Sequence, residues 1–138
     1  MKLCIRSMLL AGLLALACAT ASAVNVVPDA EVDALVTLED IADTETGMTG
    51  TVTNHGDVPV TEVQVQVSYA WLWKNDRRPQ GPSPGWTEMH TLPMRLEPGE
   101  SQPFAVAHEQ PRPARDDGEL TMSVKVVGLT RWTFQRAR

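Results

Sequence analysis

The sequence predicts an all-β fold, an antiparallel β-sandwich of about seven strands. Apolar residues recur at every second position in several short runs, which is the period of a strand with one face in a core. Clusters of Gly, Pro, Asn and Asp separate these runs at regular intervals. No stretch shows a convincing helical period. Short strands with this regular punctuation indicate two packed antiparallel sheets.

The strands can be assigned in order along the chain. The first two are an alternating run at residues 32–38 and a threonine-rich run at residues 49–53. The clearest run lies at residues 63–73, where apolar side chains fall in phase at intervals of two: Val63, Val65, Val67, Tyr69, Trp71 and Trp73. Later strands are expected at residues 86–92, 102–108, 120–128 and 129–135.

The first 23 residues have the layout of a secretory signal peptide, with two basic residues, an apolar run at residues 8–17 and Ala-Ser-Ala at residues 21–23. The apolar run is shorter than the ~20 residues that cross a bilayer, and no later segment is apolar enough to span one. We therefore expect no transmembrane segment, cleavage near Ala23, and a periplasmic or secreted protein. The alternative is a lipoprotein anchored through Cys18, because bacterial lipoproteins are cut just before a cysteine that is then acylated.

Cleavage would leave a short N-terminal tail at residues 24–30 and a single domain at residues 31–138. Both cysteines, Cys4 and Cys18, would leave with the leader, so the exported domain must be held together by its core alone. A chain of this length is sufficient for one such domain.

The chain is acidic, with a formal net charge of −5 at pH 7. Residues 24–62 carry nine acidic residues and no Lys or Arg. Such a surface repels phosphate backbones, so we expect no nucleic-acid partner. We interpret the acidic part as a solvated face rather than a cation-binding surface.

A recognisable pattern starts at Gly-x-Val-x-Asn over residues 50–54, continues through a turn with Gly56, and ends with Val-x-Val-x-Val over residues 63–67. Later, residues 96–104 read Leu-Glu-Pro-Gly-Glu-Ser-x-x-Phe. Over about residues 34–128 the chain resembles the FxLYD and CARDB-type immunoglobulin-like domains of exported bacterial proteins. The resemblance implies an immunoglobulin-like sandwich that serves as an envelope module, adhesion part or spacer without catalytic residues.

The turn in this pattern contains His55 and Asp57, which we interpret as turn residues rather than active-site groups. Asn54 can bond nearby backbone, and Gly56 tolerates a positive φ. Elsewhere, no serine has an adjacent base, and paired carboxylates such as Glu39-Asp40 point to opposite faces of a strand. We predict no enzyme, no catalytic residues and no cofactor. A hydrolase with a site assembled from distant residues is left as an alternative.

A copper site is the main rival hypothesis. Met89, His90 and Met94 offer soft and borderline ligands that suit Cu(I). A periplasmic copper-handling protein would use these three residues.

The favoured site is the loop at residues 74–85, KNDRRPQGPSPG, which is too rich in proline for a central strand and long for a hairpin. Trp and Arg are enriched at binding hot spots. We therefore predict an exported, non-catalytic binding or accessory module of the bacterial envelope, which recognises a protein or envelope polymer through Trp73, Arg77, Arg78 and Trp86. For Trp73 and Trp86, a place in the core and a role in binding fit the sequence equally well. For Trp71, its position in the alternating pattern favours the core.

Overall fold

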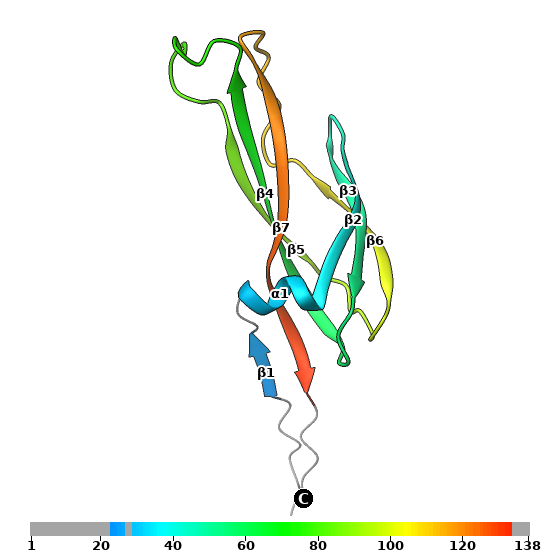
Figure 1. Ribbon diagram of the computed structural model, residues 1–138. Coiled ribbons are helices and arrows are strands. Elements are labelled where there is room, and N and C mark those ends of the chain that lie inside the picture. The colour runs from blue at the N-terminus through cyan, green and yellow to red at the C-terminus, as the bar shows by residue number, and fades with distance from the viewer. Residues whose placement is uncertain (1–22, 27–28, 134–138) are drawn as a thin grey trace, which may run out of the picture.

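The computed structural model describes residues 23–26 and 29–133, and two antiparallel sheets pack face to face in it (Figure 1). The first sheet has the strand order β1-β7-β4-β5, and the second has the order β2-β3-β6. The predicted all-β sandwich is confirmed. The bounds of the elements are β1 Ala23–Val26, α1 Asp29–Leu35, β2 Val36–Asp43, β3 Gly47–Asn54, β4 Val60–Trp73, β5 Trp86–Leu92, β6 Ser101–Ala107 and β7 Gly118–Thr133.

The pairing between distant strands defines the topology. Strands β2 and β3 pair as neighbours in sequence, as do β4 and β5, but β3 also pairs with β6 and β4 with β7. These last two pairs correspond to the B–E and C–F pairs of an immunoglobulin sandwich. The chain therefore passes from one sheet to the other after β1, after β3, after β5 and after β6.

The expected count of about seven strands becomes six within the described part of this domain, residues 31–133. The run at 120–128 and the described part of the run at 129–135, up to Thr133, were expected as two strands but belong to one strand, β7, of 16 residues. The register of β7 against β4 shifts on both sides of the pair Gln64–Gly128. A β-bulge adds a residue without ending the strand, so the apolar pattern changes phase while the pairing continues.

The N-terminal part also differs from the expectation. Residues 24–30, expected as a tail, include most of β1, which pairs with the end of β7, and the start of α1. The run at 32–38, expected as one strand, is helical up to Leu35 and extended from Val36. Val32 and Val36 are both buried. A spacing of four residues puts two side chains on one face of a helix as well as of a strand, so the alternation concealed the helix.

The core lies between the two sheets, and the strict alternation of β4 is confirmed. Val63, Val65 and Val67 are completely buried, while the residues between them face outward or are partly exposed. Complete burial of such a side chain contributes about 1.5–3 kcal/mol. The core also contains Val32, Val36, Met48, Val52, Val60, Tyr69, Leu92, Leu96, Phe104, Val126 and Leu129.

The long pair β4–β7 sets the shape of the molecule. In Figure 1 its upper end extends past the second sheet and carries the loop between β4 and β5. The start of β1 and the end of β7 lie together at the opposite end. The loop at residues 74–85 is therefore presented at a tip, away from both ends of the described chain.

Candidate partner-binding site

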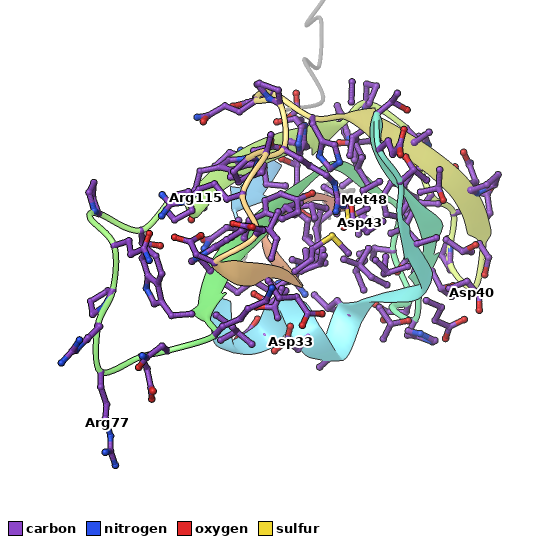
Figure 2. The ribbon with its side chains drawn as sticks, turned by 90° about the horizontal axis from the view of Figure 1, so that it is seen from above. Asp33, Asp40, Asp43, Met48, Arg77 and Arg115 are labelled. Atoms are coloured by element: carbon purple, nitrogen blue, oxygen red, sulfur yellow. The ribbon has the colours of Figure 1, made fainter. Side chains whose placement is uncertain are left out.

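The predicted loop leaves the end of β4 at Trp73 and returns at the start of β5 at Trp86. Residues 74–83 are exposed throughout, and they include both Arg77 and Arg78. Figure 2 shows Arg77 directed away from the sandwich, at the far point of the loop. The two arginines are therefore open to a partner.

Arg115, which precedes β7, holds the base of this loop. Its Nη2 donates a hydrogen bond to the carbonyl oxygen of Gln80 (3.1 Å), and its Nε donates to Oδ1 of Asp117 (3.0 Å). A second bond from Arg115 Nη2 reaches Oδ2 of Asp117. The hydrogen bond from Arg115 holds the pKa of the Asp117 carboxyl below its usual value, so the pair remains charged near neutral pH. Sequence reasoning missed Arg115 because it lies 35 residues from its acceptor Gln80.

The same guanidinium lies against two tryptophan rings. The Cζ atom of Arg115 is 5.1 Å from the ring centroid of Trp73 and 5.8 Å from that of Trp71. The two rings meet edge to face, with centroids 6.3 Å apart. Trp71 is 8% exposed, which confirms its expected place in the core, whereas Trp73 is partly exposed. A Cβ atom at Gly118 would lie 2.3 Å from Trp71 Nε1, so only glycine fits there.

Trp86 has different neighbours, so the structure does not bring the two predicted tryptophan anchors together. Its ring stacks on Tyr69 with centroids 4.4 Å apart and an angle of 23° between the planes. Its Nε1 donates a 2.7 Å hydrogen bond to Oε1 of Glu88. The structure therefore favours the core interpretation for Trp86 and leaves Trp73 at the base of the loop.

A buried carboxylate at Glu88 was not anticipated from the sequence. Glu88 is 1% exposed, and besides Trp86 it accepts hydrogen bonds from the backbone N–H of Glu109 (2.9 Å) and from His90 Nε2 (2.9 Å). Burial alone would raise the pKa of Glu88, but these hydrogen bonds outweigh it and lower the pKa. The alternation of β5 could have indicated this position, because Glu88 shares the inner phase with Trp86 and Leu92.

His108 extends this polar network toward the second sheet. Its Nδ1 lies 3.0 Å from the Tyr69 hydroxyl, and its Nε2 lies 2.9 Å from the Thr44 carbonyl oxygen and 3.4 Å from Asp43 Oδ1. Asp43 in turn bonds Arg112. Burial raises the pKa of Tyr69 to about 12, with further contributions from the charges of Asp43 and Glu88. The phenol is therefore neutral at ordinary pH, and the network joins the two sheets.

The copper hypothesis depends on Met89, His90 and Met94 converging. Met89 is 51% exposed on the outer face of β5, whereas His90 faces inward and lies 2.9 Å from Glu88. Adjacent strand residues point to opposite faces, so these two side chains cannot bind one ion together. Met94 packs against the core. In the described part of the chain, no group of three or more His, Cys, Asp or Glu residues is arranged to hold a metal ion.

The turn at Asn54–Asp57 has the structural role expected of it. The buried Asn54 donates from Nδ2 to the carbonyl oxygens of Val58 (2.9 Å) and Leu96 (3.1 Å), and its Oδ1 accepts from the N–H of Gly56 (2.8 Å). His55 and Asp57 are exposed. The positive φ considered for Gly56 is not found; among the described glycines it occurs at Gly81 and Gly99.

Comparison of the chain with protein-family models, with curated proteins and with solved structures finds no match. The resemblance of residues 34–128 to FxLYD and CARDB-type domains therefore stays a prediction. Within residues 23–26 and 29–133, no helix is long and apolar enough to span a membrane. Of the expected leader, residues 1–22 lie outside the described residues, and these include the apolar run, the first two residues of the Ala-Ser-Ala cleavage signal and the alternative anchor at Cys18.

Proposed function

We propose that the protein is an exported, non-catalytic binding or accessory module of the bacterial cell envelope, and that it recognises its partner through the loop at residues 74–85. The observation that carries this proposal is the contact of Arg115 with the loop. One guanidinium bonds the loop backbone at Gln80, pairs with Asp117 and lies on Trp73.

This contact supports binding because it orders the loop before a partner arrives. The loop contains three prolines, which restrict its backbone further. A segment that is already ordered loses less conformational entropy on docking than a free loop of the same length. The exposed arginines at its far point can then contact a partner at a small entropic cost.

The charge of the loop indicates an acidic partner. Lys74, Arg77 and Arg78 outnumber its single acidic residue, Asp76, although the chain as a whole is acidic. Guanidinium groups bind carboxylates in a two-pronged geometry that is stronger than a neutral hydrogen bond. An acidic protein segment or an acidic envelope polymer fits this surface.

A small hollow at the base of the loop would take one group of such a partner. Its volume is about 170 Å³, which suits a single side chain or a sugar substituent rather than a whole small-molecule ligand. The residues that line it are Trp73, Lys74, Asn75, Arg78, Gln80 and Asp117. Trp73, Arg77 and Arg78 are the proposed contact residues, while Trp86 positions the start of β5.

The test is a crosslinking pull-down from the cell envelope with the wild type and the double variant Arg77→Glu, Arg78→Glu. The matched control is Arg95→Glu, which reverses the charge of an exposed arginine outside the loop. The proposal predicts a partner that the wild type and the control capture and the double variant loses, with all three equally stable. Capture of the same partner by all three would contradict it and move the site to another face.

A further inference from the structure

One side of β7 has no strand beside it for most of its length. β4 pairs with β7 from Gly118 to Arg131, while β1, on the other side, pairs only with residues 130–133. Among the described residues, no strand pairs with this second side from Gly118 to Leu129. In an immunoglobulin sandwich, strand G occupies this position beside strand F.

The backbone at this edge has a defined orientation. The N–H of Lys74 donates to the carbonyl oxygen of Asp117 (3.0 Å), so the odd-numbered residues of β7 bond β4 at this end. Backbone groups alternate between the two sides of an antiparallel strand. The N–H and C=O groups of Leu120, Met122 and Val124 therefore point to the open edge, where they form a template for another strand.

The inner face of the same edge is apolar and incompletely covered. Leu120, Met122 and Val124 pack against the core but are only partly buried. Next to them, between β7 and β2, lies a groove of about 410 Å³. It is lined by Asp33, Val36, Thr37, Leu38, Val124, Lys125 and Val126. A strand added here would cover these side chains with apolar residues of its own at alternate positions.

We propose that the added strand is β7 of a second copy of this chain, with the two β7 strands antiparallel about a two-fold axis at Met122. In this register Leu120 of one copy faces Val124 of the other, so apolar residues meet on the inner face. In this register the backbone hydrogen bonds between the two copies join even-numbered residues only. These are the residues whose N–H and C=O groups point to the open edge.

The outer face of the same register is complementary in charge, which is why a second copy fits this edge. Glu119 of each copy lies opposite Lys125 of the other, so the two-fold axis creates two such pairs. In the described part of the chain neither residue belongs to an ion pair. They are six residues apart on one strand, about 20 Å, so they cannot meet within a single copy.

Sedimentation equilibrium of the chain, purified as its host processes it, tests this pairing with a charge swap. We expect a dimer whose dissociation constant rises about tenfold or more for Lys125→Glu and for Glu119→Lys, because each change places two pairs of like charges opposite one another. Combining both changes should restore the wild-type dissociation constant. This restoration distinguishes a β7–β7 contact from a general effect of charge.

A wild type that stays monomeric at high concentration would overturn the proposal, as would a dimer that is insensitive to the single variants or is not restored by the double variant. A monomer that binds only a strand from another protein would also overturn it. None of these results bears on the loop at residues 74–85, since the proposed dimer does not depend on recognition by that loop.

Discussion

Strands β4 and β7 pair along most of their length, yet they are buried to very different degrees. The inner residues Val65 and Val67 of β4 are completely buried, whereas Met122 and Val124 of β7 are only partly so. Apolar residues alternate in the facing parts of both strands, at residues 63–71 of β4 and 120–126 of β7. The difference arises because β4 has a strand on each side, while β7 has β4 alone from Gly118 to Leu129. Position within the sheet, rather than the pattern of the strand, decides the burial.

β5 covers the edge of β4 that faces away from β7, which we call the closed side of β4. The largest loss of stability is expected from a substitution in β5. Replacing Glu88 by Ala removes the acceptor of the Trp86 indole N–H and of the Glu109 backbone N–H. Leaving these two part-buried donors without their buried acceptor should lower the free energy of unfolding by about 3–5 kcal/mol. Urea denaturation measures this, with Glu97→Ala, an exposed carboxylate, as the control. Equal stability of the two variants would show that the Glu88 network does not hold the closed side.

Tyr69 lies on the inner face of β4, so the pKa of its hydroxyl reports how completely the core at this point is shielded from water. Its folded-state pKa of about 12 lies above its ordinary value of 10.0, so the stability that it contributes is complete below pH 10 and is lost as the pH rises through 12. The total loss should be about 3 kcal/mol. Because the chain contains a single tyrosine, its ultraviolet absorbance reports this ionisation directly. A titration midpoint near pH 10 in the folded protein would mean that the side chain is open to water.

Val67 and Val124 face one another across the two strands and allow a matched test. Val67→Ala should lower the free energy of unfolding by about 2 kcal/mol, because it leaves a cavity in the closed core. Val124→Ala should lower it by about 1 kcal/mol or less, because part of that side chain already contacts water. Equal losses at low protein concentration would contradict the difference between the two strands.

The smallest effect on stability is expected at the tip. Arg115→Ala removes a partly exposed ion pair and should leave the free energy of unfolding nearly unchanged. It should nevertheless release the loop at Gln80, which would increase proteolytic cleavage between residues 74 and 85 and weaken capture of the partner. Unchanged cleavage and capture would show that Arg115 does not order the loop.

The sequence predicted the features that depend on local pattern. The period of two at residues 63–73 identified β4 and its buried face, and the turn residues around Asn54 were placed correctly. The same reasoning failed where one spacing fits two structures. Val32 and Val36 suit a helix and a strand alike, and the bulge at Gly128 resembles the end of one strand and the start of another.

The candidate site was predictable only in part, because its contacts join distant segments. The exposed arginines follow from the composition of residues 74–85. The positions of Trp73 and Trp86 do not follow from the composition. Trp86 stacks on Tyr69 and bonds Glu88, while Trp73 contacts Arg115. The contacts with Tyr69 and with Arg115 each join two different segments. The open edge of β7 was equally hidden, because alternation shows which face of a strand is buried but not which strands lie beside it.

Amide hydrogen exchange along β7, measured as a function of protein concentration, tests the contrast between the two strands most directly. We expect the amides of Leu120, Met122 and Val124 to exchange rapidly in dilute protein and to become protected as the concentration rises. The amides of Thr121 and Ser123, which bond β4, should be protected at every concentration. Protection of the even-numbered amides at all dilutions would mean that the chain covers this edge itself, and rapid exchange at all concentrations would mean that no second copy binds there.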